Sequence, residues 1–158
     1  MDDRTKNLKG SESRDQFKQL HKTELYSNFY ATDIDLGLVE KHPVPFIVAC
    51  CDFKRHGDLI TFAEVIAYNQ LVNAPPPWRI PVYIIEATTS FVNEESEYHK
   101  FNIYEYIQGD PYPDPPVVTK RLLKESLSWD ELKEWEWTLR MTRRKEFMAA
   151  RQGRVNIN

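Results

Sequence analysis

The sequence predicts an α/β protein in which a mixed four-stranded sheet is flanked by helices, in the order α-β-β-α-β-β-α. Three observations predict this class: apolar, β-branched segments alternate with helical ones, one helical segment separates two strands, and a long helical segment follows the last strand. A helix between two strands permits a right-handed parallel crossover, so we expect a mixed sheet.

Length and composition indicate a soluble globular protein. The 158 residues are enough for one domain with its own core, and 41 % of them are hydrophobic while 28 % are charged. No run reaches the roughly 18 apolar residues of a membrane span, and the polar N-terminus has no apolar segment of a secretory signal. We expect no membrane association, and we divide the chain into a flexible tail at 1–13, a core at 14–116 and a C-terminal helical extension at 117–158.

The two cysteines, Cys50 and Cys51, are adjacent. Neighbours on a strand point to opposite faces, so these thiols are not expected to form a disulfide with each other. Cysteine usage therefore indicates a reducing compartment, and we expect a cytoplasmic protein.

The first half of the chain contains a predicted helix followed by a hairpin. Residues 14–27 have apolar side chains at helical spacing. Within residues 28–39, the apolar Ile34, Leu36 and Leu38 alternate with Asp33, Asp35 and Gly37, which predicts a strand with one apolar face. Prolines mark a turn at 40–45, and the almost continuous apolar run at 46–54 predicts a strand buried on both faces.

A capping box, Thr61 with Glu64, predicts the start of a helix over residues 62–73. Two further strands are predicted at 80–91 and at 101–107.

Residues 108–116 contain several prolines and predict an extended connection. Ser128 and Glu131 form a second capping box, which opens a helix that continues to about residue 151. Its apolar stripe consists of Trp129, Leu132, Trp135 and Leu139.

Three acids and a lysine share one face of the predicted hairpin. Because side chains alternate along a strand, Asp33, Asp35, Asp52 and Lys54 point the same way, and a two-residue choice of register decides which of the first two lies opposite Asp52. Two carboxylates about 4 Å apart repel by about 4 kcal/mol at an effective dielectric constant of 20. The cluster therefore requires a shared proton or a cation, and oxygen ligands of this kind suit Mg²⁺.

An acid in the first strand of a hairpin, followed by Asp52-Phe53-Lys54 at the end of the second, resembles the PD-(D/E)XK nuclease superfamily. The helices expected before and after the hairpin, and the strand that follows, agree with a restriction-endonuclease-like core. Asp35 stands where the first acid belongs, with Asp33 as the alternative. The spacing between the two acids is longer than usual, and the proline that precedes the first acid is absent.

The resemblance implies a metal-dependent nuclease, with DNA favoured over RNA as the substrate. It implies Mg²⁺ or Mn²⁺ held by Asp35 and Asp52, and a Lys54 that orients the attacking water and stabilises the transition state. Gln70 on the following helix would support Lys54 or the water, with Tyr68 as the alternative. Glu24 on the first helix would complete the metal site.

The C-terminal segment from residue 120 carries a net charge of +4, on a body of net charge −7. Its basic cluster consists of Arg140, Arg143, Arg144 and Lys145. These side chains would bind nucleic-acid phosphates or simply complement the helix dipole. The tryptophans of the same helix suggest a second function, a non-catalytic scaffold that uses this helix to bind a protein partner or to form homo-oligomers.

Overall fold

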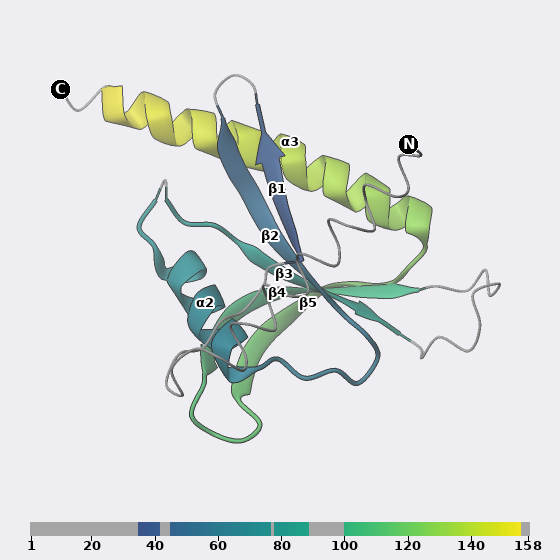
Figure 1. The fold of residues 1–158 in the computed structure, drawn as a ribbon. Helices are drawn as coiled ribbons and strands as arrows, with labels where there is room; N and C mark the ends of the chain where they lie inside the picture. Colours follow the sequence, from purple (N-terminus) through teal and green to yellow (C-terminus); the bar gives the residue numbers. More distant parts are fainter. Residues whose placement is uncertain (1–34, 42–44, 77, 89–99, 156–158) are drawn as a thin grey trace, which may run out of the picture. The chain divides into compact units, whose positions relative to one another are not determined.

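The computed structural model describes residues 35–41, 45–76, 78–88 and 100–155, and within them it is an α/β protein with a mixed sheet. The sheet has five strands in the spatial order β1-β2-β3-β4-β5 (Figure 1). The elements are β1 Leu36–Glu40, β2 Phe46–Lys54, α2 Phe62–Asn73, β3 Val82–Ala87, β4 Phe101–Asp110, β5 Val117–Leu127 and α3 Trp129–Val155. The predicted class and the two described helices are confirmed, whereas the prediction of four strands is wrong. The helix predicted at 14–27 lies outside the described residues.

The hairpin of β1 and β2 is antiparallel, and a bulge divides it into two registers. Leu36 pairs with Cys51 near the open end, but Val39 pairs with Ile47, so that one residue of β2 is extra. Continuing the first register by one residue places Asp35 opposite Asp52. Of the two registers predicted for this end of the hairpin, the structure therefore has the one that brings Asp35 to Asp52.

The connection from β2 to β3 passes through α2, and the two strands are parallel, as predicted. Thr61 and Glu64 form the predicted capping box at the start of α2. The helix ends at Asn73, and Ala74 is extended because the residue before a proline avoids helical geometry.

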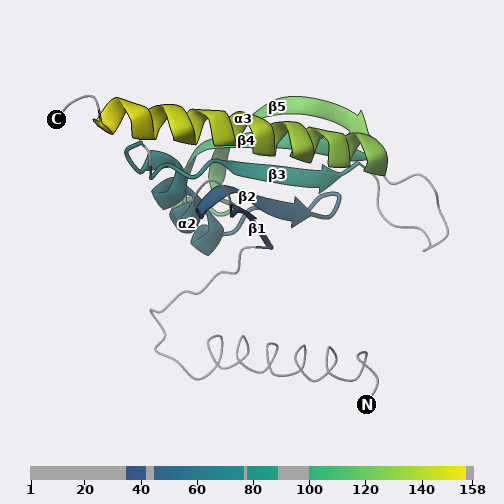
Figure 2. The ribbon, with the colours of Figure 1, turned by 90° about the horizontal axis from the view of Figure 1, so that it is seen from above.

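The two faces of the sheet are covered by different helices (Figure 2). Cys50 lies in the core under α2, whereas Cys51 lies in the core under α3, and both are buried free thiols. This confirms that β2 is buried on both faces and that the two cysteines point apart. Neither helix of the described region is long and apolar enough to cross a membrane.

Strand β5 was missed because its sequence lacks a clear alternation. It is an edge strand, and most of its side chains are exposed, so polar residues occur at neighbouring positions. Its pairing with β4 also contains several register shifts, which break the period of two. The predicted proline-rich connection begins later than expected, because β4 continues to Asp110.

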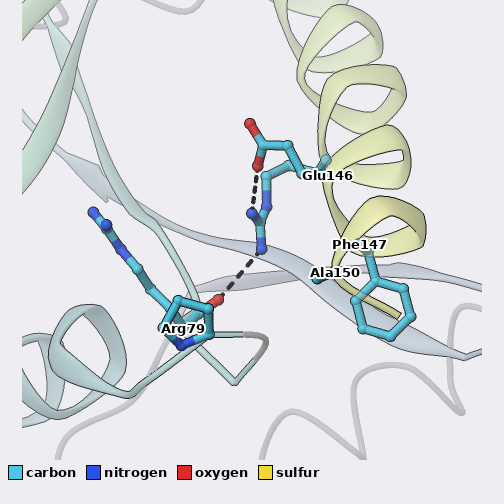
Figure 3. A pocket seen from close by; sticks show the side chains of 6 residues that line it. Arg79, Glu146, Phe147 and Ala150 are labelled. Carbon is cyan, nitrogen blue, oxygen red and sulfur yellow. Dashed lines mark hydrogen bonds and ion pairs between the residues drawn. The ribbon is translucent and has the colours of Figure 1, made fainter. Parts of the chain in front are cut away.

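Helix α3 begins at the predicted capping box and runs beyond residue 151 to Val155. Leu132, Trp135 and Leu139 pack against the sheet, as the predicted apolar stripe requires. In the second half of the helix, the guanidinium of Arg143 donates hydrogen bonds to the backbone carbonyls of Val48 and Arg79 and to Glu146. A pocket of about 230 Å³ lies here, between α3 and the segment that precedes β3 (Figure 3).

Gly109 on β4 allows a close approach to α2. The side chain of Asn69 accepts a hydrogen bond from the Gly109 N–H and donates one to its carbonyl. A Cβ atom at this position would lie 2.6 Å from the Tyr106 hydroxyl oxygen and 2.8 Å from a methyl carbon of Val65. The contact therefore requires glycine.

We expect Gly109→Ala to destabilise the protein by about 1–3 kcal/mol, because the added methyl group overpacks this contact. Urea unfolding followed by circular dichroism measures the change. Gly37→Ala is the matched control, since a Cβ atom added to that strand glycine would have nothing within 4 Å. Equal stability of the two variants would contradict the proposed close packing.

Candidate functional site

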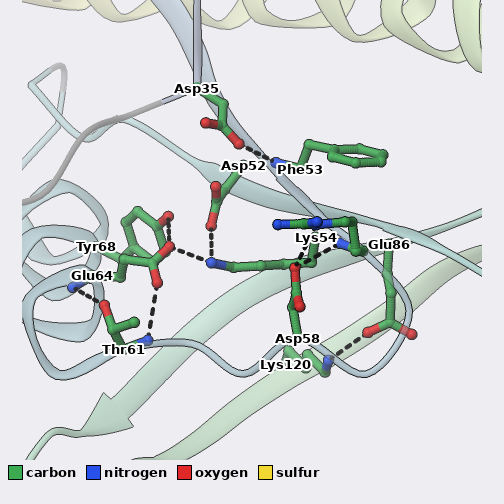
Figure 4. Close-up of polar contacts among 11 residues, drawn as sticks. Asp35, Asp52, Phe53, Lys54, Asp58, Thr61, Glu64, Tyr68, Glu86 and Lys120 are labelled. Atoms are coloured by element: carbon green, nitrogen blue, oxygen red, sulfur yellow. Dashed lines mark hydrogen bonds and ion pairs between the residues drawn. The ribbon is translucent and has the colours of Figure 1, made fainter. Parts of the chain in front are cut away.

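Side chains from the hairpin and from α2 meet at the end of β2 (Figure 4). Asp52 and Lys54 point to the face that α2 covers, because they follow Cys50 at intervals of two residues along β2. Helix α2 contributes Glu64 and Tyr68, which lie four residues apart on one side of that helix. The predicted Asp35, Asp52 and Lys54 are therefore accompanied by two residues of α2.

Lys54 lies between two carboxylates. Its Nζ atom is 2.5 Å from Oε2 of Glu64 and 3.2 Å from Oδ2 of Asp52. Burial alone would lower the pKa of Lys54, but the hydrogen bond with Glu64 and the charge of Asp52 outweigh it and raise that pKa. The ammonium is thus held charged in one position.

Glu64 is held on both of its carboxylate oxygens. Oε1 accepts a hydrogen bond from the Thr61 N–H at 3.0 Å, while Oε2 accepts from Lys54 and from the Tyr68 hydroxyl. Burial acts to raise the pKa of Glu64, yet the neighbouring Asp52 carboxyl group and the hydrogen bond from Lys54 prevail and lower that pKa. Glu64 therefore caps the helix and also fixes the position of Lys54.

From the sequence alone, Glu64 is predicted only as a capping residue. The four-residue spacing of Glu64 and Tyr68 is the signal for its second role, the contact with Lys54. This spacing places both side chains on one face of the helix that comes after the Asp52-Phe53-Lys54 strand.

Asp52 is a buried acid, and it is only 3 % exposed. Its Oδ2 atom is buried and has no hydrogen-bond partner, because Lys54 approaches it without hydrogen-bond geometry. Burial raises the pKa of Asp52 above its ordinary value, and the neighbouring carboxyl groups of Glu64 and Asp35 raise it further. Binding a proton or a cation would therefore stabilise this carboxyl group.

Asp35 lies at the entrance to the site and is exposed. One of its carboxylate oxygens, Oδ2, accepts a hydrogen bond from the Phe53 N–H at 2.9 Å. This bond holds the carboxylate beside the end of β2, next to Asp52. The other predicted acids, Asp33 and Glu24, lie outside the described residues.

Gln70 is not brought to the site by the structure. It is exposed on α2, and within the described part of the chain it makes no hydrogen bond to Lys54. A helix turns about 100° per residue, so Gln70 is rotated by roughly 200° from Tyr68. The support for Lys54 that was predicted from Gln70 comes instead from Glu64. Tyr68, the predicted alternative to Gln70, donates a hydrogen bond to Glu64.

The predicted nucleic-acid-binding arginines of α3 lie on the opposite face of the sheet from Asp52. Arg140 and Arg144 form ion pairs with Glu40 at 3.5 and 2.9 Å, and Arg143 donates to backbone carbonyls. The bond from Arg144 holds the pKa of Glu40 below its ordinary value, despite opposing desolvation. These three side chains join α3 to the sheet, whereas Lys145 is exposed.

Asp35 and Asp52 are the residues that could hold a metal ion. Among the residues that the structure describes, no group of three or more His, Cys, Asp or Glu side chains is placed to do so. A site with two carboxylates suits Mg²⁺, which is commonly bound through one or two carboxylates with water completing its shell. The buried Oδ2 atom of Asp52 without a hydrogen-bond partner fits such an ion.

The fold and the site together define an α/β protein with a carboxylate–lysine cluster at the end of a hairpin strand. Comparisons with protein-family models, with curated proteins and with solved structures found no match.

Proposed function

We propose that this protein is a metal-dependent nuclease of the PD-(D/E)XK type, which hydrolyses phosphodiester bonds of nucleic acid. The observation that carries the proposal is the buried carboxyl group of Asp52, whose Oδ2 atom has no hydrogen-bond partner and lies beside the Lys54 ammonium. In this pair, the Asp52 carboxylate would bind a metal cation, and the Lys54 ammonium supplies a positive charge that is already in position. The hairpin, the helix after it and the parallel strand that follows agree with the core expected for this superfamily.

Each residue of the site has a role in this proposal. Asp35 and Asp52 hold Mg²⁺ or Mn²⁺, which when bound would activate water and neutralise charge on the phosphate. Lys54, fixed by Glu64, binds a phosphate oxygen or orients the attacking water. Tyr68 donates to Glu64 and so keeps that carboxylate turned toward Lys54.

The test is cleavage of labelled single- and double-stranded DNA and RNA by the purified chain, with Mg²⁺, with Mn²⁺ or with EDTA. We expect metal-dependent cleavage, with DNA preferred, and a loss of at least about 100-fold in Asp52→Asn, by analogy with the loss of other positioned catalytic groups. Asp130→Asn is the matched control, because this exposed acid lies at the start of α3. Cleavage that persists unchanged in Asp52→Asn would refute the assignment.

The alternative function is a non-catalytic scaffold that binds a protein partner, or a second copy of this chain, through α3. One observation favours it: Trp137 on α3 is 64 % exposed, although Trp135 of the same helix packs on Tyr83. Light scattering after size-exclusion chromatography would compare the parent chain with Trp137→Ala. Two results together would favour the scaffold over the nuclease: an oligomer that is lost in Trp137→Ala, and a melting temperature that Mn²⁺ does not raise.

A further inference from the structure

The face of the sheet that carries Lys54 continues across β3 to the β4–β5 pair. Lys54 is the register partner of Glu86 on β3, and Glu86 forms an ion pair with Lys120 of β5 at 3.9 Å. The Nζ atom of Lys120 also lies 4.1 Å from the ring centroid of Tyr104. These contacts place a further cation on the site's own face, and Figure 4 shows it beyond Lys54.

An exposed aromatic residue lies at the rim of the same region. Tyr112, in the turn between β4 and β5, is 85 % exposed. Its N–H donates to Asp110 Oδ1 at 3.1 Å, and its ring meets the edge of Phe62 with the centroids 6.1 Å apart. Phe62 is the first residue of α2, two residues before Glu64, so the Tyr112 ring is positioned close to the helix turn that holds Lys54.

Within the part of the chain that the structure describes, this face has too few cations for binding that depends on many phosphate contacts. Lys54 is assigned to the chemistry of the site itself, and Arg55, which follows it in the sequence, pairs with Asp58 at 3.7 Å. The arginines of α3 described above lie on the other face. A protein that binds duplex DNA typically neutralises several phosphates, whereas a single strand also gains from stacking its bases on aromatic rings.

We propose that the β4–β5 pair binds single-stranded nucleic acid and guides it to the site, with Tyr112 stacking on a base and Lys120 contacting a phosphate. The inference rests on the proposed nuclease function and names its substrate class. Tyr104 and Glu86 hold the Lys120 ammonium on this face, so that less side-chain freedom is lost when a phosphate binds. A duplex would not offer an unstacked base to Tyr112.

The test is fluorescence anisotropy with a short fluorescein-labelled DNA strand and its duplex, in EDTA so that binding is measured apart from cleavage. We expect the full chain to prefer the single strand, and Tyr112→Ala to weaken this binding about fivefold or more. Lys120→Ala should reduce the slope of log affinity against log salt by roughly 0.7.

Two variants serve as controls. Tyr112→Phe keeps the ring and should retain affinity, and Arg121→Ala removes a cation that pairs with Glu105 on the other face of β5. Thermal melts establish that each variant is folded.

Equal affinity of Tyr112→Ala and the parent chain, or equal binding of duplex and single strand, would overturn the inference even if cleavage is observed. Preferential single-strand binding that depends on Tyr112 in a chain that cleaves nothing would instead refute the nuclease function alone.

Discussion

Asp52→Asn is expected to make the protein more stable than the parent chain at pH 8, in the presence of EDTA. The variant keeps the shape of the side chain but removes a carboxylate that is buried and lacks a hydrogen bond on Oδ2. One unit of pKa shift corresponds to about 1.4 kcal/mol, so we expect a gain of at least about 1 kcal/mol. Urea unfolding at several pH values measures it.

The sign of the pH dependence follows from the raised pKa of Asp52. Burial, with the Glu64 and Asp35 carboxyl groups, raises this pKa in the folded state above the ordinary value of 3.8. The folded state therefore binds the proton more tightly than the unfolded state does. The stability that the protonated group contributes is fully present below the ordinary pKa and is lost as the pH rises through the raised one. Asparagine does not titrate, so the difference between variant and parent should grow across this window.

Asp130→Asn is the control for general charge effects, because Asp130 is exposed. It should show no comparable growth in stability relative to the parent as the pH rises. A difference between Asp52→Asn and the parent that is the same at pH 4 and pH 8 would contradict the raised pKa. The same variant loses cleavage in the proposed function, so stability and activity should change in opposite directions.

Lys54→Met is expected to destabilise the protein at neutral pH by about 3–5 kcal/mol, the range for removing one partner of a buried ion pair. The substitution leaves the Glu64 carboxylate buried and without its ammonium, which lay 2.5 Å from Oε2. It also removes the positive charge beside Asp52. Chemical unfolding of the full chain measures the change.

Two comparisons make the Lys54 result specific. Lys133→Met removes an exposed lysine whose ion pair with Asp130 spans 3.7 Å, and it should change stability by less than about 1 kcal/mol. Adding Glu64→Gln to Lys54→Met should recover part of the lost stability, because the uncompensated charge is removed. A Lys54→Met protein as stable as Lys133→Met would show that the ammonium does not stabilise this cluster.

Local patterns were sufficient for the elements that have a strong signal. Thr61 with Glu64, and Ser128 with Glu131, predicted the starts of α2 and α3 from side chains only three residues apart. The apolar run of β2 predicted a strand buried on both faces. By contrast, β5 is not predicted by its sequence. Both faces of an exposed edge strand can carry polar side chains, so apolar and polar residues do not alternate, and bulges interrupt its pairing with β4.

The sequence by itself determined which side chains of the hairpin share a face. A period of two residues along β2 is enough to align Asp52 with Lys54, and it is independent of the rest of the fold. Only the tertiary structure decided that Asp35 meets Asp52, since a bulge beyond Leu38 sets the register. It also decided that Glu64 contacts Lys54 and accepts a hydrogen bond from Tyr68, whereas Gln70 lies exposed on α2. The reason is that register and helix orientation depend on packing between separate segments, whereas the alternation within a strand depends only on its own backbone.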